Sequence, residues 1–221
     1  MGGLVGGSKK NSYRIQTKKF NTFIMDKKNM GTRILIIDIE TTGLQPQTGH
    51  IAEIGLVELD LSTGEKKILL DRVVHEKGMT KQEVENSWIV KNGYMTMEEI
   101  RTAPNLATIR GEIQFIIDGY PNGATAFNKA FDFGFLQSRG FLFPRILDCP
   151  MILSTDVCQL EPTEKMKKYK PYLKYKTPNV MEAYKHFFPN SKYVELHRGA
   201  DDAFHEADIV LALYKEGKFT V

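Results

Sequence analysis

The stretch ILIIDIETTG, residues 34–43, decides the fold of this chain. Its aliphatic start predicts a buried strand. Side chains alternate between the two faces of a strand, so Asp38 and Glu40 point to the same side at its end. Two carboxylates that close resist joint ionisation, and a divalent cation such as Mg²⁺ or Mn²⁺ relieves the repulsion. Thr41, Thr42 and Gly43 then suit a turn in which the backbone passes close to a ligand.

The composition indicates an ordinary globular protein. Hydrophobic residues make up 42% and charged residues 26% of the 221 residues, which suits one domain with a sizeable core. No apolar stretch approaches the length that spans a membrane, so we expect no membrane association. Cys149 and Cys158 form no metal-binding pattern and no disulfide framework, which favours a reducing, cytoplasmic location.

The charge is concentrated at the start of the chain. The net charge of the whole chain is +3. Residues 1–30 alone carry a net charge of +6, so the remaining residues carry −3. We expect residues 1–30 to be a basic, flexible tail or an added leader, and residues 31–221 to form the domain. A basic arm that touches phosphate is the alternative function for this tail.

Strands come first along the domain, and helices then alternate with a strand. Beyond the first strand at 33–39, the patterns predict strands at residues 50–61, 67–74 and 124–127. Helices are expected at residues 80–88, from a Thr96–Glu99 capping box, after Pro104, and at 129–139, 177–188 and 199–216. Short turns between the first three strands indicate an antiparallel meander, and the whole order favours one mixed sheet with helices on its faces.

The hexapeptide DIETTG after an aliphatic run resembles the first motif of the DEDD exonucleases, the DnaQ-like superfamily that includes polymerase proofreading domains. Alone, an Asp-x-Glu pair at a strand end is more often solvated and structural. The family's second motif, Asn-x-x-Phe-Asp, is matched by Asn128, Phe131 and Asp132. Many members have His before that Asn, where this chain has Phe127. Without the resemblance, Asp132 would be an ordinary acid in the first turn of a helix.

A third motif is similar to the histidine-bearing (DEDDh) branch of this superfamily. His197 precedes Asp202 by five residues, the spacing of that branch. The two side chains converge if His197 lies before a helix and Asp202 within it, and Gly199 permits that transition. Gly199 stands where branch members often have Ala. Asp201 is the competing ligand, but the family spacing selects Asp202.

The resemblance implies a ribonuclease H-like fold, with a mixed five-stranded sheet whose first three strands are antiparallel and with helices on its sides. It also implies two divalent cations, Mg²⁺ or Mn²⁺, held by Asp38, Glu40, Asp132 and Asp202. With His197 as general base, these four acids would form the catalytic group.

The function expected from the resemblance is 3′→5′ exonuclease action that releases nucleoside 5′-monophosphates from single-stranded 3′ ends. Residues expected to bind the substrate are Thr41, Thr42, Gly43, Asn128 and Phe131. DNA is favoured, and a DNA polymerase is a potential partner. The alternatives are an RNA-trimming or oligoribonucleotide-degrading enzyme and a non-catalytic nucleic-acid-binding scaffold with the same fold.

A lysine- and tyrosine-rich segment, residues 165–176, does not belong to any motif. Its lysines could neutralise phosphates and its tyrosines could stack on bases, or the segment could be a solvated loop whose tyrosines cover the core. Two further residues have open interpretations. Glu53 either contacts substrate or is an ordinary strand-face acid, and Trp88 is expected in the core or on a docking surface.

Overall fold

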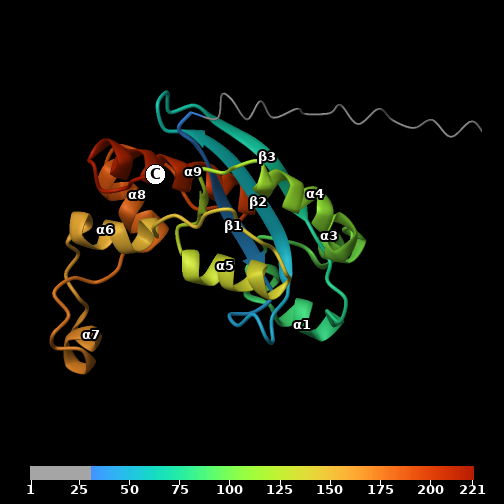
Figure 1. The fold of residues 1–221 in the computed structure, drawn as a ribbon. Helices are drawn as coiled ribbons and strands as arrows, with labels where there is room; N and C mark the ends of the chain where they lie inside the picture. Colours follow the sequence, from blue (N-terminus) through green and yellow to red (C-terminus); the bar gives the residue numbers. More distant parts are fainter. Residues whose placement is uncertain (1–30) are drawn as a thin grey trace, which may run out of the picture.

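A mixed sheet forms the centre of the protein (Figure 1). The computed structural model describes residues 31–221, so the tail expected over residues 1–30 lies outside the described residues. The strands are β1 (Arg33–Thr41), β2 (Ile51–Asp60), β3 (Lys66–Val73) and β4 (Ala124–Thr125), in the spatial order β3-β2-β1-β4. The antiparallel arrangement of the first three strands is confirmed, and β4 pairs parallel with β1.

The expectation of five strands was wrong: within residues 31–221 the sheet has four. The segment that follows helix α5 (Lys129–Ser138) does run beside β4, because Leu147 N donates to Ala124 O at 2.9 Å, but it forms only one isolated bridge, Ala124↔Ile146. β4 is itself only two residues long, so it offers little backbone for a longer ladder. In place of a fifth strand, the sheet therefore has a single bridge between Ala124 and Ile146.

Both faces of β1 are buried, which explains its continuous aliphatic sequence. Ile34 and Ile36 lie in the core on one face, while Leu35, Ile37 and Ile39 lie in the core on the other. β1 continues to Thr41, beyond the expected end at residue 39, because it keeps pairing with β2 as far as Thr41↔Ile51.

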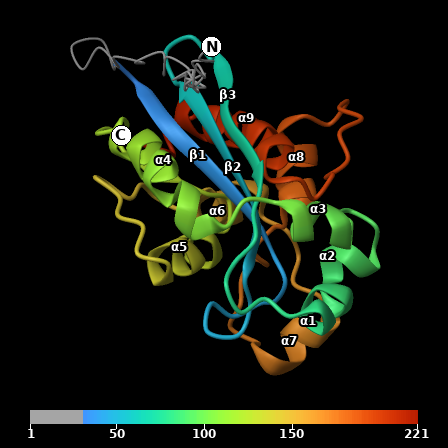
Figure 2. The same cartoon turned by 90° about the vertical axis from the view of Figure 1, so that its right-hand side faces the viewer.

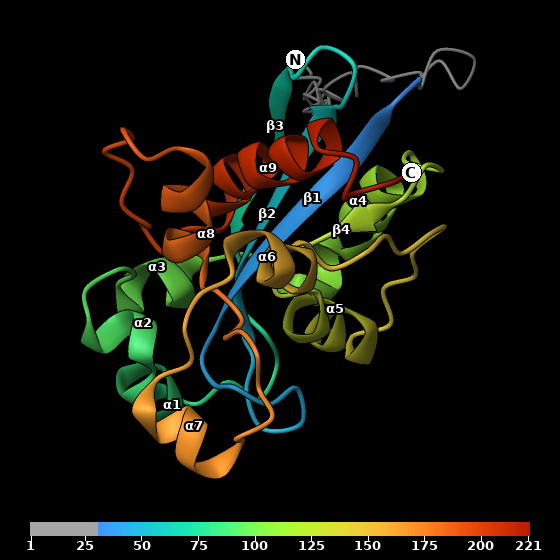
Figure 3. The same ribbon diagram turned by 90° about the vertical axis from the view of Figure 1, so that its left-hand side faces the viewer.

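Helices cover the two faces of the sheet. Helices α6 (Pro150–Cys158), α8 (Val180–Phe187) and α9 (Gly199–Lys215) pack on one face, as Figure 3 shows. Helices α4 (Leu106–Asp118) and α5 (Lys129–Ser138) pack on the other (Figure 2). Three short helices link β3 to α4: α1 (Lys81–Asn86), α2 (Trp88–Lys91) and α3 (Met97–Thr102). None of the helices in residues 31–221 combines the length and the apolar content that a bilayer crossing requires.

Side-chain caps fix several helix starts. The Thr96–Glu99 capping box is confirmed at the start of α3. The expected start of α8 at Thr177 was wrong, because Asn179 is the N-cap and forms a reciprocal capping box with Glu182. Helix α6 and helix α7 (Glu164–Tyr169) were not predicted from the sequence.

Two glycines let α9 approach the sheet closely. Gly55 of β2 lies opposite Asp38 of β1, and Gly199 opens α9. A Cβ atom on Gly55 would lie 2.1 Å from the carbonyl carbon of Gly199, and a Cβ atom on Gly199 would lie 2.8 Å from Gly55 N. This contact brings the start of α9 against the end of β1, where the acids of both elements meet.

We predict that Gly55→Ala will lower the free energy of unfolding by roughly 3 kcal/mol or more, because the added methyl group meets backbone that cannot move aside. The measurement is urea denaturation followed by circular dichroism. Gly111→Ala in α4 is the matched control, since its Cβ atom meets nothing within 4 Å, and it should gain about 1 kcal/mol from helix propensity. Equal stability of the Gly55→Ala variant and the wild type would contradict the close-contact account.

Candidate metal-dependent active site

Four acids and one histidine from distant parts of the sequence gather at the end of β1. Asp38 and Glu40 share the face of Ile34 and Ile36, which is the face that α9 covers. Ligand atoms of Glu40, His197 and Asp202 lie within 4.8 Å of one another. All three side chains are thus near enough to share one bound ion.

Asp132 reaches the same place from the other side of the sheet. It is 3% exposed in the first turn of α5, and its Oδ1 accepts a hydrogen bond from Ile39 N at 3.3 Å. Ile39 lies between Asp38 and Glu40, so this bond ties the start of α5 to the pair of acids on β1. The structure therefore brings together all five residues that the sequence motifs singled out, and their catalytic roles stay predictions.

Burial and mutual repulsion raise the pKa values of these acids. The pKa of Asp38 is held well above its ordinary value, first by burial and then by the charges of Glu206 and Asp132. Burial together with Asp202 raises the pKa of Glu40 to about 8, and burial raises the pKa of Asp132 to about 7. Hard divalent cations prefer carboxylate oxygens and would remove this repulsion, so the donor set fits Mg²⁺ or Mn²⁺.

His197 lies just before α9 in a left-handed backbone conformation, with φ of 52°. This conformation is unfavourable for a residue with a Cβ atom and persists only where its surroundings hold it. Asp202 supplies that support, because its Oδ1 accepts from Leu196 N at 3.2 Å and its Oδ2 accepts from Arg198 N at 2.9 Å. The hydroxyl of Tyr193 also donates to Asp202 Oδ1 at 2.8 Å. One carboxylate thus fixes the loop that carries the histidine.

An ion pair between a buried carboxylate and a partly exposed arginine holds the same loop against the sheet. Glu53 in β2 is fully buried, and Arg198 Nη2 donates to its Oε1 at 2.8 Å. Gly199 N donates to Glu53 Oε2 at 3.1 Å. Of the two interpretations of Glu53, the structure favours an acid that anchors the loop rather than one that faces the substrate.

Aromatic rings and a further acid surround the imidazole of His197. The ring centroid of Trp88 lies 4.7 Å from that of His197, and the centroid of Tyr94 lies 4.4 Å away. Trp88 is 53% exposed, which rules out the core as one of its two expected places, and the docking surface stays a prediction. Glu195 Oε1 lies 3.9 Å from His197 Nδ1, and burial raises the pKa of Glu195 to about 7. Burial also lowers the pKa of His197, which favours the neutral imidazole.

Sequence reasoning missed Glu206, a further buried acid in this region. Its side chain is 3% exposed, and its Oε2 accepts from Phe127 N at 3.3 Å. Glu206 follows Asp202 by four residues on α9, so helical spacing alone would have placed both acids on one side of the helix. No comparable signal marks Trp88 or Glu195.

The residues expected to bind substrate have different surroundings. Thr41 Oγ1 donates to Gly43 O at 2.7 Å within the turn after β1. Thr42 is 9% exposed, and its hydroxyl accepts from His50 N at 2.9 Å and bonds to Glu83, so it supports the turn. Direct substrate contact by Thr41, Thr42 and Gly43 stays a prediction.

The remaining two substrate-binding candidates lie at the start of α5. Asn128 is exposed at the N-cap position, where its side chain makes no capping bond. Phe131 packs partly against Phe135, with 5.0 Å between ring centroids. Direct contact of Asn128 and Phe131 with the substrate stays a prediction.

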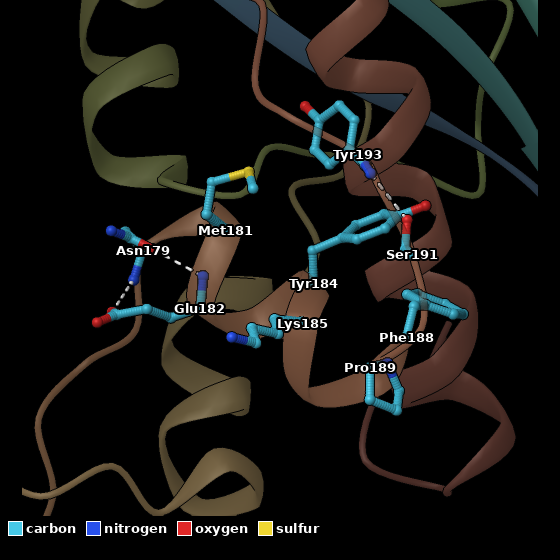
Figure 4. A pocket seen from close by; sticks show the side chains of 9 residues that line it. All are labelled: Asn179, Met181, Glu182, Tyr184, Lys185, Phe188, Pro189, Ser191 and Tyr193. Atoms are coloured by element: carbon cyan, nitrogen blue, oxygen red, sulfur yellow. Dashed lines mark hydrogen bonds between the residues drawn. The ribbon is translucent and has the colours of Figure 1, made fainter.

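A separate pocket of about 350 Å³ lies between α8 and the segment after it (Figure 4). Asn179 and Glu182 form their reciprocal capping bonds at one side, and Tyr184 and Tyr193 line another part of the pocket. None of the four acids of the cluster lines it. Tyr193 connects the two regions, because its hydroxyl bonds to Asp202.

Comparison with protein families gives a match over most of the domain. Residues 35–210 match the RNase_T model, which is described as an exonuclease. The matched range contains all five residues of the acid and histidine cluster. No curated protein matches the chain by sequence.

Solved structures confirm the fold. The nuclease domain of 3'hExo, a DEDDh family member bound to rAMP, is 14% identical with a TM-score of 0.56, covering 87% of this chain and 98% of that chain. Exonuclease I of E. coli in complex with a dA16 oligonucleotide is 13% identical with a TM-score of 0.57, covering 83% of this chain and 41% of that chain. A full-length 3'-exonuclease is 14% identical with a TM-score of 0.57, covering 85% of this chain, and the match spans 62% of its own length.

We predict that Mg²⁺ or Mn²⁺ will raise the melting temperature, because binding relieves the repulsion among the buried acids. At roughly a hundred times the Kd, the expected rise is about 5–10 °C. The measurement is differential scanning calorimetry with and without cation, and a chelator should reverse the shift. Asp38→Asn should abolish the shift, whereas the exposed control Asp156→Asn should keep it. An unchanged shift in Asp38→Asn would place the cation elsewhere.

We further predict that Glu53→Gln will destabilise the fold by about 1–2 kcal/mol, because a neutral amide replaces the buried carboxylate that accepts from Arg198 and Gly199. Chemical denaturation measures this loss. Glu98→Gln is the control: it breaks an exposed ion pair with Arg101, and we expect no measurable change. If the two variants were equally stable, the anchoring role of Glu53 would be wrong.

Proposed function

Because the chain belongs to the RNase_T exonuclease family, we propose that it is a metal-dependent 3′→5′ exonuclease of the histidine-bearing DEDD type. Its substrate would be a single-stranded 3′ end, with DNA favoured, and its products nucleoside 5′-monophosphates. The observation that carries this proposal is the meeting of Glu40, His197 and Asp202 within 4.8 Å. Asp38 and Asp132 adjoin them through the end of β1.

The acids would hold the cations of the site. Asp38, Glu40, Asp132 and Asp202 are the proposed ligands, in keeping with their burial and raised pKa values. A pair of bound divalent cations would supply a more acidic water and stabilise the charge of the entering and leaving oxygens. The protein's own contribution is to hold four carboxylates in one place before substrate arrives.

His197 would act as the general base that takes a proton from the attacking water. Partial burial lowers its pKa, so the ring stays neutral and can accept a proton at neutral pH. Glu195, 3.9 Å from Nδ1, is placed to orient the ring. Because His197 is also near enough to Glu40 and Asp202 to bind an ion, its role as base needs a test that separates proton transfer from metal binding.

The terminal nucleotide would lie between the turn after β1 and the aromatic rings beside His197. Thr41, Thr42 and Gly43 would border the terminal nucleotide on one side, with backbone amides available to the substrate. On the other side, the exposed ring of Trp88 offers a surface on which a base can stack.

RNA is the second candidate substrate. One of the similar structures is bound to rAMP, and another is in complex with a dA16 oligonucleotide. Both sugars therefore occur among proteins of this fold. A polymerase partner is not part of the proposed function, because the similar proteins support nucleic acid alone as the partner.

The proposal predicts release of nucleoside 5′-monophosphates from a 3′-labelled single strand in the presence of Mg²⁺ or Mn²⁺. The assay compares single-stranded DNA, duplex DNA and short RNA in one experiment. Asp38→Ala and excess chelator should each abolish hydrolysis while the fold persists. Full activity in either case would refute the metal assignment, and binding without mononucleotide release would support a non-catalytic scaffold.

A second prediction concerns His197→Ala. Loss of the general base should lower kcat by roughly 10²-fold or more, while the affinity for Mn²⁺ changes little. Isothermal titration of Mn²⁺ measures that affinity independently of turnover. If the variant lost metal affinity as completely as Asp38→Ala, His197 would be a ligand and not a base.

A further inference from the structure

The segment from residue 161 to residue 176 forms an exposed arm with a fixed base. Lys176 N donates to Leu160 O at 2.9 Å, which closes the base of the arm. Pro162 and Pro178 are buried at its two ends, whereas residues 163–172 are all exposed. The arm contains α7, whose start is capped by Thr163. Its tip therefore lies in solvent while its base is attached to the domain.

The arm differs in charge from the rest of the domain. Residues 161–176 hold six lysines against two glutamates, a net charge of +4, whereas the other described residues together carry −7. Two of these lysines are paired: Lys167 with Glu164, and Lys176 with Glu182. The arm is thus a segment of net positive charge on a domain whose remaining described residues are net negative.

Exposed tyrosines are interleaved with these lysines. Tyr169 is 69% exposed and Tyr172 is 82% exposed. The Nζ of Lys168 lies 5.7 Å from the ring centroid of Tyr169, so ring and cation present one combined surface. The alternative in which the tyrosines cover the core does not hold for these two residues.

The arm lies at the end of the molecule that carries the acids of the site, where it could contact a nucleic-acid strand that enters the site. Asp38 and Glu40 lie at the end of β1, and α7 lies beyond this same end of the sheet, on the side that α6 and α8 cover (Figures 1 and 3). A strand whose 3′ end occupies the site can thus extend towards α7.

We propose that the arm binds the single-stranded nucleic acid upstream of the 3′ end, with lysines on its phosphates and Tyr169 and Tyr172 stacked on its bases. The inference rests on the proposed function, since it needs a nucleic-acid substrate in the site. Interleaved cations and exposed rings suit a single strand better than a duplex, whose bases are already stacked. An acidic protein surface would use the charge but not the rings.

The test compares two arm variants, Lys168→Gln/Lys170→Gln and Tyr169→Ala/Tyr172→Ala, with the remote control Lys215→Gln/Lys218→Gln. All six residues are exposed, so the fold should persist. For a strand of about 20 nucleotides, each arm variant should raise KM roughly tenfold with kcat unchanged. Hydrolysis of a dinucleotide, which is too short to reach the arm, should not change. The lysine variant should also reduce the salt dependence of binding by about 2 in log–log slope.

If the arm variants lost as much activity on the dinucleotide as on the long strand, they would be disturbing the site or the fold, and the proposal would be wrong. An unchanged KM for the long strand would also overturn the proposal. If the tyrosine variant alone behaved as wild type, base stacking would be excluded.

Binding measurements separate this inference from the proposed function. Fluorescence anisotropy with a labelled 20-nucleotide strand, in the Asp38→Asn background, reports on the arm without turnover. If the wild type hydrolysed no nucleic acid, the proposed function would be wrong. A drop in the affinity of both arm variants for the 20-nucleotide strand would still support nucleic-acid binding by the arm. Equal affinity for an oligoglutamate peptide and the oligonucleotide would overturn the assignment to nucleic acid.

Discussion

Repulsion among crowded carboxylates at the end of β1 constrains the surrounding structure. Burial and the charges of Glu206 and Asp132 hold the pKa of Asp38 far above its ordinary value. Such an arrangement is unfavourable by itself, so the rest of the fold must hold the acids in place. The Gly55–Gly199 contact, the bond from Ile39 N to Asp132 and the two amide bonds to Asp202 do so from three directions. The same repulsion is what would make the site bind a divalent cation tightly.

The loop before α9 shows how the fold holds these mutually repelling carboxylates in place. His197 has a left-handed backbone, and both of its neighbours donate amide hydrogen bonds to Asp202. Glu53 then holds Arg198 and Gly199 against the sheet. A carboxylate that we propose as a metal ligand thus also determines where the histidine lies. Substitution of Asp202 would for this reason disturb both groups, which makes Asp38 the cleaner position for testing metal dependence.

The sequence predicted the acids better than their surroundings. The period of two in a strand placed Asp38 and Glu40 on one face without further information, whereas the proximity of Asp132 and Asp202 followed only from the resemblance to a family. Glu206 was predictable from helical spacing. Trp88 was not, because its exposed position depends on how α2 meets the loop of His197.

The differences between the predicted fold and the observed fold have local causes in the sequence. The missing fifth strand reflects a β4 of only two residues, a length that no strand propensity predicts. Helix α7 has no buried residue, so it lacks the apolar stripe that marks most helices. The start of α8 was misplaced although the Asn179–Glu182 capping box is visible in the sequence, because Thr177-Pro178 offers a competing start signal.

The central claim is that these acids form one cation site, and anomalous diffraction from crystals grown with Mn²⁺ tests it most directly. The account predicts anomalous density between Asp38, Glu40 and Asp202, with Asp132 facing it from α5. Anomalous density confined to surface carboxylates, with the end of β1 empty at saturating Mn²⁺, would contradict it.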